Sequence, residues 1–151
     1  MKQNPQMAKI QENMQPGTLS AEGFLGEDRR SLSDILLADS QIVQKNGQTH
    51  QSIADQMRRL TEAGKPELGR PLRLGQFEVT VEDHRGRLPC PFRDRYGAEK
   101  RITTAKHLAT GQTLTWTDLH IHMIEAHGFY EGLGSKFRLD PERLIEFFFS
   151  G

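Results

Sequence analysis

The chain of 151 residues contains one cysteine, Cys90. A single cysteine excludes an intramolecular disulfide and every zinc site that takes two or more thiolates from one chain. No uninterrupted apolar run approaches the roughly 20 residues that span a bilayer, and the N-terminus lacks the basic and then apolar order of a secretory signal. We therefore expect a cytoplasmic protein that does not enter membranes.

An excess of charge of one sign is also lacking, because 20 basic and 20 acidic side chains give a net charge of zero. The charges are unevenly placed, since residues 70–106 carry nine basic and five acidic side chains. Such a stretch is suited to meet a polyanion, but it is equally suited to pair with another part of the fold. Nucleic-acid binding is therefore one hypothesis. Its candidate residues are five arginines and two aromatic rings for stacking on bases: Arg85, Arg87, Arg93, Arg95, Arg101, Phe92 and Tyr96.

The first 27 residues have few aromatic or β-branched side chains and are rich in Gln, Asn, Gly and Pro. A segment of this composition buries too little apolar surface to offset the entropy lost on ordering. We expect residues 1–27 to form a flexible arm.

Apolar residues recur at helical spacing after this arm. A first helix is expected from the N-cap Ser31 to about Lys45, and a second from the N-cap Thr49 to about Gly64. The short connection between them predicts a helical hairpin over residues 28–65.

Further along, apolar and polar residues alternate, which predicts strands. Residues 77–81 form a first strand, residues 83–86 read as a turn, and residues 87–92 are expected to return beside the first strand. Residues 102–108 and 113–116 predict a second β-hairpin. Two hairpins suffice for one small antiparallel sheet.

The segment from Thr115 to Gly128 holds three of the six histidines and the only tryptophan. Its run Asp118-Leu119-His120-Ile121-His122 resembles the Asp-x-His-x-His metal motif of the amidohydrolases and of the polymerase-and-histidinol-phosphatase phosphoesterases. This resemblance implies a metal-dependent hydrolase on a barrel. On a strand, alternate histidines share one face and converge on a metal.

Local signals instead predict a helix over this motif. Thr117 is a good N-cap, Asp118 favours the first turn, and Gly128 is a natural C-terminal stop. His120 and His122 would then diverge by about 200° around the helix. A barrel domain also needs about 250 residues, whereas only 29 residues follow His122. We therefore reject the barrel hydrolase.

Leu119-x2-His122-x4-His127 is similar to the helical half of a Cys2His2 zinc finger. This resemblance implies zinc, with Cys90 and Asp94 standing where a finger has two cysteines. On an ideal helix His122 and His127 diverge by about 140°, so a site with all four ligands requires the helix end to distort. The hypothesis is a zinc-binding protein or a metal-assisted hydrolase that uses Cys90, Asp94, His122 and His127.

The Gly-rich stretch from Phe129 to Arg138 is the best candidate wall of a ligand pocket. Its glycines expose backbone donors, and Lys136 and Arg138 add positive charge for an anionic small molecule. Across this loop and the His-rich helix, the candidate ligand-binding residues are Trp116, His120, His127, Tyr130, Lys136 and Arg138.

The final helix begins at Pro141 behind the cap Asp140 and carries three consecutive phenylalanines. Phe147 and Phe149 exceed what one buried stripe needs in a chain of this length. Another surface has to cover them, and we predict self-association as a homodimer.

Together these features predict an α+β protein: a helical hairpin, a small antiparallel sheet of two β-hairpins, and two C-terminal helices within residues 70–151. We expect a small cytoplasmic binding or interaction protein with a ligand pocket between the His-rich helix and the Gly-rich loop. Zinc binding, with or without hydrolysis, and nucleic-acid binding are the alternatives. No catalytic residue is assigned, because nothing places Cys90 at a helix N-terminus or in an oxyanion-binding turn. A binding protein is therefore favoured over an enzyme.

Overall fold

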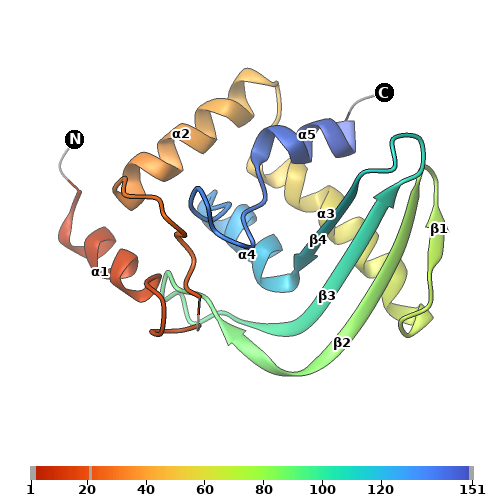
Figure 1. Cartoon of the computed structure of the whole chain (residues 1–151), viewed down its shortest axis with the longest axis horizontal. Helices are drawn as coiled ribbons and strands as arrows, with labels where there is room; N and C mark the ends of the chain where they lie inside the picture. The colour runs from red at the N-terminus through yellow and green to blue at the C-terminus, as the bar shows by residue number, and fades with distance from the viewer. Residues whose placement is uncertain (1–2, 21, 150–151) are drawn as a thin grey trace.

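A computed structural model of the chain describes residues 3–20 and 22–149, and these residues form an α+β fold, as predicted (Figure 1). The helices are α1 (Pro5–Asn13), α2 (Leu32–Lys45), α3 (His50–Gly64), α4 (Asp118–His127) and α5 (Pro141–Phe149), with a short 3-10 turn at Lys65–Glu67. The strands are β1 (Leu72–Leu74), β2 (Phe77–Pro89), β3 (Gly97–His107) and β4 (Thr113–Thr117). Within the described ranges, no helix combines the length and apolar character needed to cross a bilayer.

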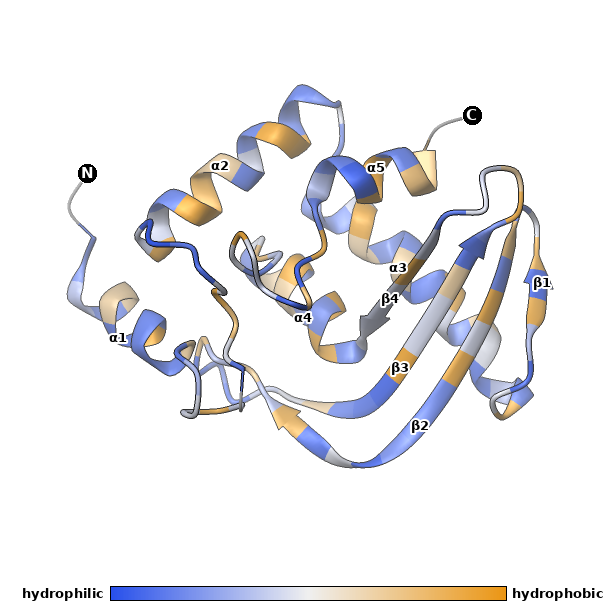
Figure 2. Cartoon of the chain, in the orientation of Figure 1, coloured by the Kyte–Doolittle hydropathy of each residue, from blue (hydrophilic) through white to orange (hydrophobic). Residues whose placement is uncertain are grey.

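The four strands form a single antiparallel sheet in the order β1-β2-β3-β4. β2 and β3 are long and curved, and the helices lie on the concave side of this pair (Figure 1). Hydrophobic and hydrophilic residues alternate along both strands (Figure 2). Val79 faces Ala105 across the ladder, and both are fully buried beneath the helices. One face of the sheet is therefore core and the other faces solvent.

The turn of the first predicted hairpin was placed at the wrong residues. Residues 83–86 do not reverse the chain, because β2 continues to Pro89 and shifts register between His84 and Arg87. Gly86 has a φ of 108°, a conformation that favours glycine and that suits a β-bulge. The true reversal lies at residues 90–96, so Cys90 and Asp94 come to the tip of the β2–β3 hairpin.

The predicted helical hairpin is present, and its caps form as expected. The Ser31 side chain accepts from the backbone N–H of Asp34, and Thr49 forms a capping box with Ser52. Beneath the sheet, α3 contributes the buried hydroxyl of Thr61, which bonds to Thr103 at 2.6 Å and accepts from the Trp116 indole at 3.0 Å. This buried network ties α3 to the strands, so the hairpin and the sheet share one core.

We expected residues 1–27 to form a flexible arm, but the described part of this segment is folded against the rest of the chain. Residues 1–2 and 21 lie outside the described ranges. α1 is capped by the Asn4 side chain, which accepts from the Met7 backbone N–H. Ile10 and Met14 are buried with Cys90 in a second apolar cluster. The few apolar residues of the arm suffice here because the hairpin tip and α4 cover them, which composition alone does not reveal.

The extra phenylalanines of α5 are largely covered within the chain. Phe147 is 1% exposed and packs against Phe77, with 5.2 Å between the two ring centroids. Phe148 and Phe149 are half-buried against the same core. The reason for predicting a homodimer therefore falls away, and self-association stays a prediction without this support.

Candidate metal centre

α4 forms because its ends are well capped. Thr117 and His120 make a capping box, in which the Thr117 hydroxyl accepts from the His120 backbone N–H at 3.2 Å. Gly128 closes the helix with a φ of 63°. The helix separates the two histidines of the rejected hydrolase motif, since His120 bonds to Glu131 and His122 bonds to Asp94.

The loop of residues 90–96 carries the other half of the site. Arg93 and Arg95 have φ values of 59° and 66°, which side chains other than glycine rarely adopt. Asp94 lies between these two residues, and one of its carboxylate oxygens accepts the Tyr96 backbone N–H at 3.0 Å. Left-handed residues on both sides turn the Asp94 side chain toward α4. Backbone strain of this kind is often retained at functional sites.

Four side chains from the loop and the helix converge. One ligand atom from each of Cys90, Asp94, His122 and His127 lies within 4.8 Å of the other three. The Asp94 Oδ2 atom accepts from the Nε2 atoms of His122 and His127 at 2.6 and 2.7 Å. The predicted distortion of the helix end is absent, because Gly128 still donates to Ile124 at 3.0 Å. Instead, Asp94 lies between the two histidines, and the Nε2 atom of each imidazole reaches its carboxylate.

Each of the two histidines is stacked on an aromatic ring of the loop. Tyr96 lies 3.7 Å from His122 between centroids, Phe92 lies 3.9 Å from His127, and both pairs are within 5° of parallel. The stacking fixes the imidazole planes. It also occupies the two rings that the nucleic-acid hypothesis needed for stacking on bases.

The charges near this loop are partly engaged as well. Arg101 is one of the five arginines named as candidates for nucleic-acid contact. It forms ion pairs with Asp83 at 2.7 Å and with Asp118 at 2.6 Å. Arg85 and Arg87 are exposed on β2, and Arg93 and Arg95 are exposed on the loop. The basic stretch predicted from the sequence is thus divided between internal pairing and open surface.

The electrostatics of the four groups differ. Burial raises the pKa of the Asp94 carboxyl, but the hydrogen bonds from His127, the Tyr96 backbone and His122 outweigh it and hold that pKa well below its usual range. Burial raises the pKa of the Cys90 thiol to about 12, and this thiol is 5% exposed. A buried thiol with a raised pKa is a poor nucleophile.

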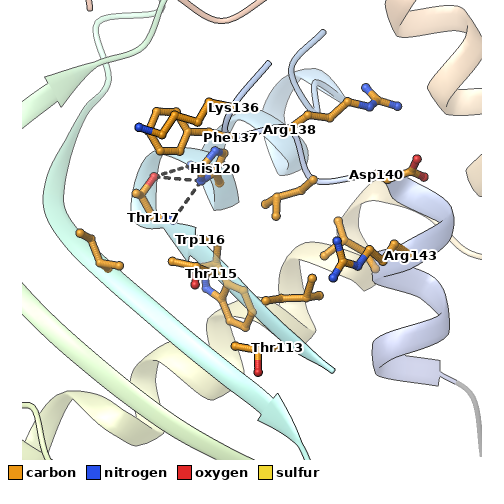
Figure 3. A pocket seen from close by; sticks show the side chains of 14 residues that line it. Thr113, Thr115, Trp116, Thr117, His120, Lys136, Phe137, Arg138, Asp140 and Arg143 are labelled. Atoms are coloured by element: carbon orange, nitrogen blue, oxygen red, sulfur yellow. Dashed lines mark hydrogen bonds between the residues drawn. The ribbon is translucent and has the colours of Figure 1, made fainter. Parts of the chain in front are cut away.

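The six residues predicted to bind a ligand are brought together only in part. Trp116, His120, Lys136 and Arg138 line one cavity of about 360 Å³ (Figure 3). Tyr130 instead forms a hydrogen bond with His50, with 2.8 Å between Oη and Nδ1, and His127 lies at the candidate metal centre. The Gly-rich loop thus borders a cavity together with His120, whereas His127 and Tyr130 lie outside that cavity.

Sequence reasoning missed the partners of these residues. Glu131 is 3% exposed, accepts from His120 at 2.7 Å and adopts a φ of 72°. Asp39 forms a two-pronged ion pair with Arg138 across 99 residues of sequence. A buried carboxylate has no local sequence signature, so only the fold identifies these pairs.

Comparison of the chain with models of protein families, with curated proteins and with solved structures gives no match.

Proposed function

We propose that the protein binds one zinc ion through Cys90, Asp94, His122 and His127. The single observation that carries this proposal is the convergence of one thiol, one carboxylate and two imidazoles within 4.8 Å. Zinc takes these donor types in tetrahedral sites, where ligand atoms lie about 3.3–3.6 Å apart. Shifts of about an ångström would complete such a shell. The ion would take the place of the two Nε2 protons that His122 and His127 now donate to Asp94, and the Cys90 thiol would release its proton to solvent.

The zinc would be structural rather than hydrolytic. Four protein ligands fill a tetrahedral shell, whereas a catalytic zinc keeps a position for water or substrate. The ion would join the β2–β3 tip to the end of α4, two regions that no covalent cross-link connects. The stacked rings of Phe92 and Tyr96 would orient the histidines, as supporting residues around metal sites usually do.

The wider role that we propose is that of a cytoplasmic binding or interaction protein rather than an enzyme. α4 buries Leu119, Ile121 and Ile124 in the core, so it is not free to enter a DNA groove as the helix of a zinc finger does. A reducing cytoplasm would keep Cys90 available as a ligand. Self-association is a separate prediction that light scattering of the purified chain would test.

Metal analysis tests the zinc site directly. The chain is purified without a metal-affinity tag, and its zinc content is measured by mass spectrometry after dialysis. We expect close to one equivalent per chain. Less than about a tenth of an equivalent, even after exposure to zinc, would show that the cluster is only a hydrogen-bonded group around Asp94.

Variants identify the ligands. Cys90→Ser and His127→Gln should lower zinc content and affinity, whereas His84→Gln, on the exposed part of β2, should not. Cobalt substitution adds a second readout, because a thiolate ligand gives a charge-transfer band that Cys90→Ser would abolish. Full zinc content in Cys90→Ser would contradict the assignment of Cys90, and circular dichroism checks that each variant is folded.

A further inference from the structure

Two cavities meet beside the Gly-rich loop, and none of the four proposed zinc ligands lines either one. The first, here called the polar cavity, has a volume of about 360 Å³, and the second, the apolar cavity, about 270 Å³. They share four wall residues: Ile102, Thr117, His120 and Phe137. Two cavities with common walls are adjacent chambers, and their combined size suits a small organic ligand.

The apolar cavity offers hydrocarbon surface. It is lined mainly by Leu19, Phe24, Leu88, Leu119 and Met123. Its ionisable groups are already engaged, because His120 donates to Glu131 and the other Glu131 oxygen accepts from Ser135 at 2.8 Å. The Thr117 backbone N–H occupies the remaining ring nitrogen of His120. An apolar body is therefore the complementary occupant of this chamber.

One cation at the polar cavity has no partner among the described residues. Arg143, on the first turn of α5, makes no side-chain hydrogen bond or ion pair within residues 3–20 and 22–149. In Figure 3 its guanidinium extends toward the side of Trp116 and Thr115, while the carboxylate of Asp140 turns away. A free guanidinium at a cavity wall is a receptor for a carboxylate, which it pairs with through two parallel hydrogen bonds.

Two further basic side chains offer hydrogen-bond donors at this chamber. Lys136 is at its rim, 68% exposed, and its ion pair with Glu22 is long at 3.6 Å. Arg138 is neutralised by Asp39, yet its Nε atom is buried and has no acceptor among the described residues. A buried donor without an acceptor usually marks a place for water or a ligand oxygen.

We propose that the two cavities form one binding site for a small organic anion with an apolar body, of the class of medium-chain or aromatic carboxylates. The carboxylate pairs with Arg143 in the polar cavity, and the apolar body passes Phe137 into the apolar cavity. This site is separate from the proposed zinc site and does not depend on it. The unpaired arginine and the adjoining apolar chamber together set the ligand class, since neither butyrate nor an uncharged alcohol would satisfy both.

Calorimetry with three probes tests this ligand class on the full chain as purified: octanoate, butyrate and 1-octanol. Trp116 lines the polar cavity and is the only tryptophan, so its fluorescence gives a second readout. We expect saturable binding of one octanoate, with butyrate and 1-octanol each weaker by about tenfold or more. Absence of octanoate binding at millimolar concentration, or equal affinity for 1-octanol, would overturn the proposal.

Two matched variants locate the charge. Arg143→Gln should weaken octanoate by about tenfold or more, because it removes a charge-assisted pair. Arg73 is an exposed arginine on β1 that also makes no side-chain hydrogen bond or ion pair with the described residues, and Arg73→Gln should leave the affinity unchanged. Equal octanoate affinity in the two variants would place the bound anion elsewhere. Both positions are exposed, so neither change is expected to unfold the chain.

Discussion

The ring of Tyr96 lies parallel to the imidazole of His122, with 3.7 Å between their centroids. The backbone N–H of the same residue donates a hydrogen bond to the Asp94 carboxylate. One residue therefore orients two of the four proposed zinc ligands, one through its ring and one through its backbone. This arrangement makes the loop a preformed half of the site.

Removal of the ring should weaken zinc without removing a ligand. Tyr96→Ala is expected to lower zinc affinity by about tenfold, the lower end of the range for residues that support metal ligands. Tyr96→Phe keeps the stacking and should bind zinc as the wild type does. Competition against a chromophoric chelator measures both. Equal affinity of all three proteins would show that the stacked ring has no part in orienting His122.

Acid should remove the stabilising contribution of Asp28. Its hydrogen bond with Arg30, together with the one from the Leu133 backbone N–H, lowers the pKa of this carboxyl to about 2 against the ordinary 3.8, although burial opposes the shift. Because the folded-state pKa lies below the unfolded one, the contribution is complete above about pH 5 and is lost as the pH falls toward 2.

The variant Asp28→Asn measures this contribution. At pH 6 its free energy of unfolding should be about 1–2 kcal/mol lower than that of the wild type. This value is smaller than the full pKa shift implies, because solvent screens the charge of the partly exposed Arg30. Urea titrations at several pH values should show the difference between the two proteins shrinking toward zero near pH 2. A difference that stays constant over this range would rule out Asp28 as the group responsible.

Two glycines separate backbone conformation from crowding. Gly128 and Gly111 both have positive φ, at 63° and 77°, but a Cβ at Gly128 would lie 2.6 Å from the His50 ring, whereas a Cβ at Gly111 would meet nothing within 4 Å. Gly111→Ala should therefore cost about 1–2 kcal/mol of unfolding free energy, the usual cost of a left-handed alanine.

Gly128→Ala should cost a further 1–3 kcal/mol or so, because His50 has to move and its bonds to Ser40 and Tyr130 are disturbed. Thermal and urea denaturation of the two variants side by side check this ordering. If Gly128→Ala proved as stable as Gly111→Ala, the His50 ring would have to yield freely, contrary to its place between two hydrogen-bond partners.

The helices illustrate what local sequence carries. Thr117 with His120, and Gly128, satisfy orphan backbone groups at the two ends of α4, and these contacts span only a few residues. The same holds for the caps Ser31 and Thr49. Alternation likewise identified β2 at Phe77, Val79 and Val81. These elements were predictable because each signal acts within one turn or one strand.

The β2–β3 hairpin illustrates the opposite case. Asp83 to Gly86 has the composition of a turn, but a glycine with positive φ also suits a bulge inside a continuous strand. Pairing of β2 with β3 selects the bulge, since it adds ladder bonds out to Pro89 opposite Gly97. That choice depends on a strand that follows later in the chain.

By itself the sequence determined the α+β class, the ends of the capped helices α2, α3 and α4, and the four residues of the proposed zinc site. Only the tertiary structure decided that Asp94 lies between His122 and His127. Asp94 is on a hairpin tip, and the two histidines are on a helix, 28 and 33 residues further along the chain. Helical geometry alone placed the two histidines about 140° apart and argued against their meeting. The convergence arises because the β2–β3 hairpin tip supplies one Asp94 atom that both histidine rings of α4 reach. Contacts between elements of this kind are set by packing of the whole core.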